Sequence, residues 1–488
     1  DVDKDKLAEI AIKSVLKDLD PHSVYISKEE VAEMNEPLLG NFEGVGIQFN
    51  ILNDSILVVA TIAGGPSEKV GVLAGDRIVM IDGEIVAGIG ITNKGVVDRL
   101  RGAKSTEVEV EIKRIDVKKI LDFKIVRDKI PIFSIDAAYM VNDHIGYIKV
   151  NRFAAKTPQE FIEALDKLDK RGMTNLILDL QGNSGGYLNA AFKMTDEILG
   201  DNKLIVYTEG KSSLRNEMKA TAYGHYEDEN IVVLIDQYSA SASEIMSGAI
   251  QDWDRGLIIG RRSFGKGLVQ RPLPLPDGGQ IRLTIANYYT PSGRFIQKPY
   301  ADGVDSYRMD LANRFSSGEL TDSLIQEFPD SLKFETKNGR IVYGGGGITP
   351  DIYVPLDTSF NTEFYAQALR KGLINKFTLS YANKNRKALT EYYPDIETFD
   401  QKFMADEEFL AEFLEYCAEE EIDIDKDQVA KSAKVLGLQL KGLIARNLFS
   451  GEAYYYVVNK EMNQSFITAV EAIENNWFKK YNVTWTKK

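Results

Sequence analysis

The alternation of short apolar runs with amphipathic stretches, from His144 to about residue 260, constrains the fold more than any other feature of the chain. Four runs have the length and apolar character of buried strands: IGYIKVNRF, NLILDLQ, IVVLID and LIIG. The stretches between them carry apolar residues at helical spacing: TPQEFIEALDKLDKRG, AAFKMTDEIL and SEIMSGAIQDW. Repeated strand–helix units of this kind predict an α/β core.

Regions with a different pattern flank this core. Short β-like runs separated by glycines, from about Asn41 to Arg114, predict a small β-rich domain. Helical spacing marks the first residues and the acidic region after about Asp357. The sequence therefore predicts a multidomain α/β protein with four parts: a helical segment over 1–38, the β-rich domain over 39–116, the core over 117–356 with a polar insertion at about 300–343, and a helical domain over 357–488.

Composition excludes several classes of protein. With 488 residues we expect two to four domains. The net charge of -14 argues against a nucleic-acid partner, because phosphate-binding surfaces concentrate Lys and Arg. Three scattered histidines and the single Cys417 give no metal-ligand spacing, so we expect no metal and no cofactor. No apolar run is long enough to cross a bilayer, and we expect that a targeting segment is missing from this sequence.

The stretch from Tyr238 to Gln270 carries the first candidate for chemistry, Ser241. Its SASE sequence matches a capping box, in which a serine caps a helix and a glutamate three residues later caps the serine. A helix N-terminus also stabilises a developing negative charge, so Ser241 could also act as a nucleophile, with the Ala242 N–H as an oxyanion donor. The pattern alone leaves both interpretations open.

Lys266 lies between two glycines and is followed by an apolar segment. Such a lysine is commonly a solvated loop tip. In an extended chain, however, Lys266, Leu268 and Gln270 share one face, and burial on that face would lower the lysine pKa. A neutral amine could then accept the serine proton, and the uncharged Gln270 could orient it.

Two glycine-containing segments are candidates for binding backbone groups of a ligand. GNSGG follows a buried strand and lacks the spacing and lysine of a phosphate loop, so Gly185 or Gly186 could supply a second oxyanion N–H. GVGIQF is either a hairpin turn or a loop whose N–H groups capture a peptide carboxylate; its candidate binding residues are Gly44, Val45, Gly46 and Ile47.

Taken together, these motifs resemble the C-terminal processing (tail-specific) serine peptidases. The resemblance extends over residues 7–355 and includes the motifs YSASASEI, RSFGKGLVQ, LDPHSVYI, LDLQGNSGGYL, TPSGRFIQ and GITPDIYV. GVGIQF with PSEKVGVLAGDRIVMIDG resembles the PDZ domain of that family. The sequence departs from the family at Gln181 and Ser184, where Arg and Pro are usual, and Asp252 matches an acidic family position on what we expect to be an exposed helix face.

The resemblance implies a Ser-Lys dyad assisted by Gln, which maps onto Ser241, Lys266 and Gln270. It implies an endopeptidase that captures apolar C-terminal tails with its PDZ domain (39–116) and cleaves nearby through an acyl-enzyme. It also implies a homodimer formed through terminal helical segments and a location in the bacterial periplasm or cell envelope. The alternative is a non-catalytic PDZ adaptor, although such a protein would not need all three residues. Acyl transfer on small thioesters would need a nucleotide-binding cleft, for which the sequence has no pattern.

Overall fold

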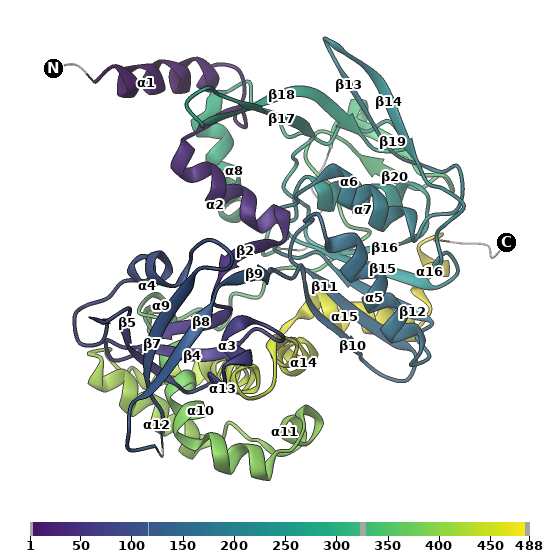
Figure 1. Ribbon diagram of the computed structural model, residues 1–488. Helices are drawn as coiled ribbons and strands as arrows, with labels where there is room; N and C mark the ends of the chain where they lie inside the picture. Colours follow the sequence, from purple (N-terminus) through teal and green to yellow (C-terminus); the bar gives the residue numbers. More distant parts are fainter. Residues whose placement is uncertain (1–2, 116, 323–327, 484–488) are drawn as a thin grey trace. The chain divides into compact units, whose positions relative to one another are not determined.

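The computed structural model describes residues 3–115, 117–322 and 328–483 (Figure 1). The chain folds into two compact units. Residues 1–40, 133–358 and 463–488 form the first unit, and residues 41–132 and 359–462 form the second. Parts of the predicted segments lie outside the described residues, namely 1–2 at the N-terminus, 116 at the end of the β-rich domain, 323–327 in the polar insertion and 484–488 at the C-terminus.

The first unit is built on a sheet with the order β10-β11-β12-β15-β16-β21. Its strands are β10 (Ile135–Met140), β11 (Ile145–Val150), β12 (Asn175–Asp179), β15 (Asn230–Ile235), β16 (Gly256–Gly260) and β21 (Ile352–Tyr353). All are parallel except β10, which pairs antiparallel to β11. The predicted α/β core is confirmed.

Helices cover both faces of this sheet, which explains why its central strands are apolar throughout. Ile148 belongs to the hydrophobic cluster shared with α5 (Thr157–Asp169), α6 (Leu188–Asp196) and α7 (Ala242–Asp252). Its neighbour Tyr147 points to the opposite face and meets Phe466 of α15 (Gln464–Glu474) with ring centroids 5.4 Å apart.

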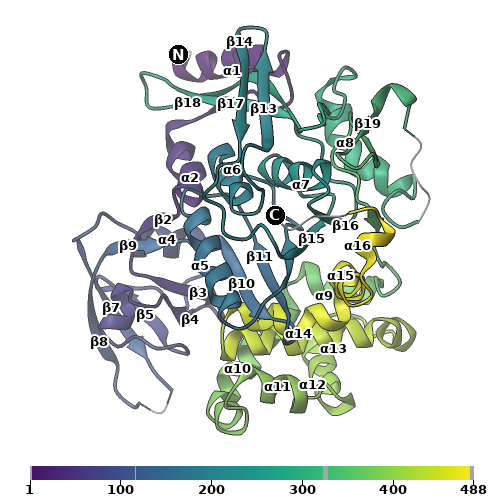
Figure 2. The same cartoon turned by 90° about the vertical axis from the view of Figure 1, so that its right-hand side faces the viewer.

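Helix α15 corrects the prediction of one helical domain over 357–488. It lies along β12, β15 and β16 of the core sheet (Figure 2), and residues 463–488, including α16 (Trp477–Lys480), belong to the first unit. Phe466, Ala469 and Ala472 are buried there. Helical periodicity in the sequence shows that α15 has an apolar face, but it does not show which surface that face covers.

A second sheet of the first unit joins the N-terminal segment to the core. It contains β1 (Val24–Ile26), β13 (Leu204–Gly210), β14 (Ser213–Lys219), β17 (Leu268–Pro274) and β18 (Gln280–Tyr289). Strand β1, between α1 (Lys4–Lys17) and α2 (Lys28–Leu39), pairs antiparallel to β18. The insertion contributes α8 (Gly303–Ser316), a short 3-10 turn (Asp330–Leu332), β19 (Lys333–Glu335) and β20 (Ile341–Tyr343).

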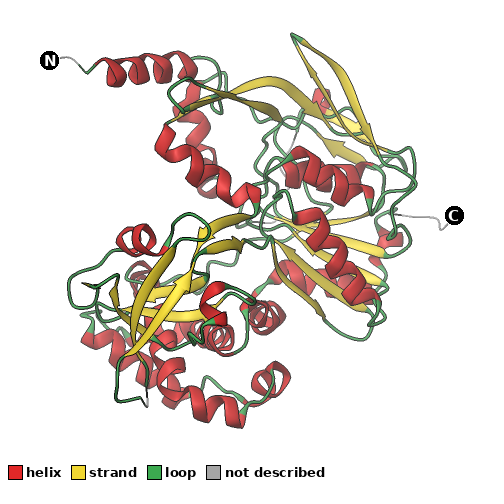
Figure 3. Ribbon diagram, in the orientation of Figure 1, coloured by secondary structure: helices red, strands yellow, loops and turns green. Residues whose placement is uncertain are grey.

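The second unit has a β-rich part and a helical part (Figure 3). The β-rich part contains β2 (Asn41–Gly44), β3 (Ile47–Ile51), β4 (Ile56–Thr61), β5 (Arg77–Ile81), β6 (Glu84–Ile85), β7 (Glu107–Lys113), β8 (Leu121–Val126) and β9 (Asp128–Pro131), with α3 (Pro66–Lys69) and α4 (Asn93–Leu100). The helical part contains α9 (Glu363–Arg370), α10 (Leu373–Tyr392), α11 (Ile396–Lys402), α12 (Glu407–Glu419), α13 (Lys426–Leu448) and α14 (Gly451–Met462). Phe399, Phe413 and Cys417 are buried in its core. Within the described residues, no helix combines the length and apolar character needed to cross a membrane.

Asp252 at the end of α7 is buried, which corrects the expectation of an exposed helix face. Its carboxylate pairs with the guanidinium of Arg294, which is itself fully buried, and accepts the Ser292 N–H at 2.9 Å. Because removing one partner of a buried pair leaves the other charge uncompensated, we expect Asp252→Ala to lower the free energy of unfolding by about 3 kcal/mol. Urea denaturation measures this loss, and a change below about 1 kcal/mol would argue against a structural pair.

Candidate active site

Ser241 occupies a sharp turn between β15 and α7 at the carboxyl end of the core sheet. Its backbone has φ 55° and ψ -112°, a conformation that a non-glycine residue rarely adopts and that is found at functional sites. The residues two positions away, Ser239 and Ser243, are fully buried, so small side chains allow the tight turn. A strained strand-to-helix turn of this kind presents a nucleophile to a cleft. The sequence analysis placed Ser241 at a helix N-terminus but did not predict this backbone strain.

The glycine turn at Gly185 and Gly186 packs directly against Ser241. A Cβ atom added to Gly185 would lie 2.8 Å from Ser241 Cβ and 3.0 Å from the Ala242 nitrogen, so only glycine fits. The Gly185 N–H donates to Asn183 Oδ1 at 2.8 Å and is therefore engaged within the turn. In contrast, the N–H groups of Gly186 and Ala242 donate no hydrogen bond within the described part of the chain, and both residues line the cavity at Ser241. Of the two glycines, Gly186 is thus the one with a free donor.

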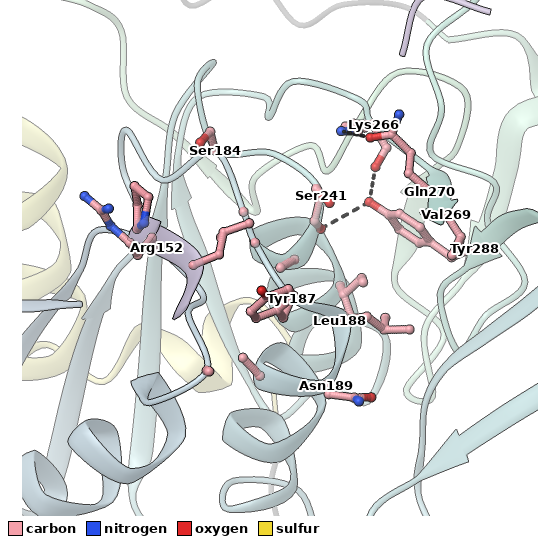
Figure 4. Close-up of a pocket in the computed structure, with 18 of the residues that line it drawn as sticks. Arg152, Ser184, Tyr187, Leu188, Asn189, Ser241, Lys266, Val269, Gln270 and Tyr288 are labelled. Atoms are coloured by element: carbon pink, nitrogen blue, oxygen red, sulfur yellow. Dashed lines mark hydrogen bonds between the residues drawn. The ribbon is translucent and has the colours of Figure 1, made fainter. Parts of the chain in front are cut away.

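Lys266 lies in the loop before β17, with a largely buried side chain. Burial lowers the pKa of Lys266, and the positive charge of Arg282 lowers it further, while Glu244 and Asp20 oppose both effects. The Lys266 amine donates to Gln270 Oε1 at 3.1 Å (Figure 4). Among the described residues no hydrogen bond joins this amine to the Ser241 hydroxyl. The structure therefore brings the lysine and the glutamine together but does not join the serine to them.

Gln270 is held in turn by the N-terminal segment. Its side-chain amide donates to the carbonyl oxygen of His22, and a β-bulge between Val269 and Gln270 interrupts the strict strand alternation that the sequence suggests. The His22 ring turns to Tyr307, with Nε2 2.7 Å from the hydroxyl. Burial and the nearby charge of Lys266 lower the pKa of His22 to about 4. The histidine beside the site is therefore neutral at ordinary pH.

Glu244 links the backbones of the two candidate catalytic residues. It is fully buried, and its Oε2 accepts the N–H groups of Ser241 at 2.8 Å and Lys266 at 2.9 Å. Its Oε1 accepts the Gly265 N–H at 2.7 Å and the Ser263 hydroxyl at 2.5 Å. Burial raises the pKa of Glu244 to about 6, although these hydrogen bonds oppose the shift. The sequence identified this glutamate only as part of a capping box.

Tyr288 is a second connection that the sequence does not reveal. This buried side chain of β18 donates its hydroxyl to the carbonyl oxygen of Ser241 at 3.1 Å and to that of Lys266 (Figure 4). Burial raises the pKa of Tyr288 well above its usual range, so the hydroxyl stays protonated. Tyr288 and Glu244 together fix the loop of Lys266 against the turn of Ser241.

A cavity of about 950 Å³ opens at these residues. The residues of the candidate chemistry line it: Gly185, Gly186, Ser241, Ala242, Lys266 and Gln270. The arrangement is suited to acyl transfer, because a nucleophile, a desolvated amine and two free N–H donors face one space. No group of His, Cys, Asp and Glu in the described ranges could hold a metal ion.

The predicted carboxylate cradle lies in the second unit, at the junction of β2 and β3. Gly44 ends β2, Ile47 begins β3, and Gly46 between them has φ 76°. The carbonyl oxygens of Val45 and Gly46 accept internal N–H groups, while their own N–H groups donate no hydrogen bond in the described part of the structure. Free N–H groups beside a strand are what a peptide carboxylate requires.

Comparisons with known proteins agree with this division of the chain. Models of peptidase family S41 and of a PDZ domain match residues 144–306 and 57–114, and a family of unknown function matches residues 364–451. The Carboxy-terminal-processing protease of Bartonella bacilliformis is 42% identical over 60% of this chain and 68% of its own. For the Carboxy-terminal processing protease CtpA of Bacillus subtilis these figures are 35%, 61% and 63%. The solved photosystem II D1 C-terminal processing protease is 29% identical over 60% of this chain and 80% of its own, with a TM-score of 0.36.

Proposed function

The chain belongs to the carboxy-terminal processing peptidases of serine peptidase family S41, and we propose that it cleaves proteins near their C-termini with Ser241 as nucleophile and Lys266 as base. In this proposal the PDZ domain captures an apolar C-terminal tail at Gly44, Val45, Gly46 and Ile47. The observation that carries it is the strained turn at Ser241, which faces a desolvated lysine amine and two free N–H groups across one cavity.

The chemistry follows from these positions. Neutral Lys266 takes the Ser241 hydroxyl proton as the oxygen attacks the peptide carbonyl carbon. The N–H groups of Ala242 and Gly186 hold the negative oxygen of the tetrahedral intermediate. The protonated Lys266 then gives its proton to the leaving amine, so that an acyl-enzyme and a shortened product form. Water attacks the acyl-enzyme by the same steps, with Lys266 again as the base.

The observed hydrogen bond between Lys266 and Gln270 represents a resting arrangement in this proposal. For catalysis the amine has to turn from the Gln270 oxygen to the Ser241 hydroxyl. Glu244 and Tyr288 hold the backbones of both residues, so we propose that the amine reaches the serine by rotation of the Lys266 side chain. Gln270 therefore holds the Lys266 amine in the resting arrangement without adding a negative charge that would raise the pKa of Lys266.

Cleavage of an unfolded protein with an apolar C-terminal tail tests the function. We expect the purified protein to shorten this substrate and Ser241→Ala to bind it without cleaving it. A non-catalytic PDZ adaptor, the alternative, would bind the tail and leave the substrate intact with or without the serine. Equal cleavage by the parent and the Ser241→Ala variant would refute the assignment of the nucleophile.

The rate should depend on pH through Lys266. Only the neutral amine is a base, and its pKa is lowered by burial, so kcat/KM is expected to rise with pH and to level off below the usual pKa of a lysine. The profile of kcat/KM on one peptide from pH 5 to 10 measures this. A rate that is flat from pH 5 to 9 would exclude a lysine base.

We also propose a homodimer formed through the terminal helical segments. The supporting observation is the exposed apolar face of α1, formed by Leu7, Ile10 and Val15. Sedimentation velocity over a range of protein concentrations should detect a dimer that Ile10→Asp weakens. If the protein stays monomeric at every concentration up to about 100 times the Kd of a typical micromolar dimer, the proposal is wrong.

A further inference from the structure

The cavity at Ser241 has a basic lining in an acidic protein. Among the described residues that line it, four are Lys or Arg and none is Asp or Glu: the four are Arg152, Lys193, Lys266 and Arg282, of which the proposed mechanism uses Lys266 in its neutral form. In the whole chain the order is reversed, since Asp and Glu number 73 against 59 Lys and Arg. The charge of this cavity therefore does not follow from the composition of the chain.

Among the described residues none of the four basic side chains takes part in an ion pair. Glu244 and Asp20 act electrostatically on Lys266 without forming an ion pair with it. The hydrogen bonds of the basic side chains go to neutral amide oxygens instead: Arg152 Nε donates to Asn151 Oδ1 at 2.9 Å, and Arg282 Nη2 donates to Asn35 Oδ1 at 3.0 Å. Positive charges that gather around a cavity without partners favour an anionic ligand.

The carboxylate of Glu244, whose charge acts on Lys266, is engaged by other donors. Glu244 is fully buried, and both of its oxygens are occupied by four donors of the turn and the loop. It faces the backbone behind Ser241 and is not part of the cavity lining. Among the described residues, the groups that line the cavity and would meet an anion there are therefore basic or neutral.

The cations lie on both sides of the nucleophile. In Figure 4 Arg152 and Lys266 appear on opposite sides of Ser241, and Arg282 is close enough to Lys266 to influence it electrostatically. Arg152 follows β11 at the glycine turn, and its planar guanidinium can hold a carboxylate through two parallel hydrogen bonds. Of the four, Arg152 is therefore the residue best suited to recognise a carboxylate without taking part in the chemistry.

We propose that the catalytic cleft selects substrates with a carboxylate within a few residues of the scissile bond, and that Arg152 is a specificity-determining residue. This inference rests on the proposed peptidase function and adds the chemistry of the segment that is cut. The carboxylate comes either from an Asp or Glu side chain or from the free C-terminus of a short peptide. Both present the same anion, so the test separates them.

Matched peptides distinguish the two sources. One series carries Glu or Gln at each of three positions on either side of the cleaved bond, and a second series ends a few residues beyond that bond as a free acid or an amide. We expect kcat/KM to favour the carboxylate member of at least one pair by about tenfold, the size of one hydrogen-bonded charge pair. In Arg152→Gln the preference within the Glu/Gln pairs should fall to near one, and the preference within the acid/amide pairs should fall to the part that the PDZ domain contributes, while the neutral peptide is still cut.

Two controls keep the outcome decisive. Arg171→Gln removes an exposed arginine that does not line the cavity, and it should keep the full preference. The PDZ domain also responds to a free acid, but its contribution is the same in Arg152→Gln, so the change in ratio isolates the cleft. Carboxylate-to-neutral ratios that are the same in the parent and in Arg152→Gln for every pair would overturn the inference while leaving the peptidase function intact. If no peptide is cut, the proposed function fails instead, and binding of the Glu and Gln peptides to Ser241→Ala then decides the preference for carboxylates.

Discussion

Replacing Lys266 with methionine is expected to lower kcat/KM by about 10⁴-fold without unfolding the protein. Methionine fills the space of the lysine stem in the cavity but has no group that can take the Ser241 proton. Burying the lysine amine away from water costs free energy on folding, and methionine does not have this cost. Thermal stability should therefore be retained or increased. Steady-state kinetics on a tailed peptide and a thermal melt of each protein measure both effects.

Lys266→Arg distinguishes a base from a positive charge. Arginine keeps the charge near Gln270, but its guanidinium stays protonated at every accessible pH. We therefore expect the arginine variant to be about as inactive as the methionine variant. If the arginine variant keeps more than about a tenth of the parent kcat/KM, a role of Lys266 as proton acceptor is contradicted. Removing a general base is expected to lower kcat/KM by much more than tenfold.

The elements that could be predicted are those whose pattern is local. The apolar runs around Ile148 and Leu178 identify the parallel sheet because strands buried on both faces leave no polar alternation. Strand β7 alternates between exposed and buried residues, as its sequence EVEVEIK predicts. In contrast, the position of α15 depends on which sheet face the other helices leave uncovered, and that is not encoded in its own residues.

The same difference separates the expected from the unexpected residues of the site. Ser241, Lys266 and Gln270 stand in short motifs, so the sequence alone could nominate them. Glu244 also stands in a motif, but that motif explains only its bond to the Ser241 N–H and not its bonds to the lysine loop. Tyr288 meets Ser241 across 47 positions of the chain, and no local pattern marks such a contact. The Lys266 amine donates to Gln270 instead of the Ser241 hydroxyl, and no local sequence pattern indicates this choice of acceptor.

Glu244→Ala is expected to affect stability and activity together. The substitution leaves the Ser263 hydroxyl and three N–H groups, those of Ser241, Gly265 and Lys266, without their acceptor in a fully buried place. Each unsatisfied group costs about 1–3 kcal/mol, and water entering the space partly offsets this cost. We therefore expect the free energy of unfolding to fall by about 5 kcal/mol. Any protein that remains folded should have a kcat reduced by about 100-fold, because the Lys266 loop is no longer fixed against the Ser241 turn.

The control is Glu30→Ala in α2, since Glu30 forms the same capping-box hydrogen bond, to the Ser27 N–H at 3.0 Å, but at an exposed helix end. There water replaces the lost acceptor, so the free energy of unfolding is expected to decrease far less than in Glu244→Ala. Urea denaturation of both variants compares the two glutamates directly. If the two losses are equal, Glu244 is no more than a helix cap. A large loss of stability with an unchanged kcat in the folded fraction would show instead that Glu244 supports the fold but does not position Lys266. Only the positioning role requires kcat to fall when the buried carboxylate is removed.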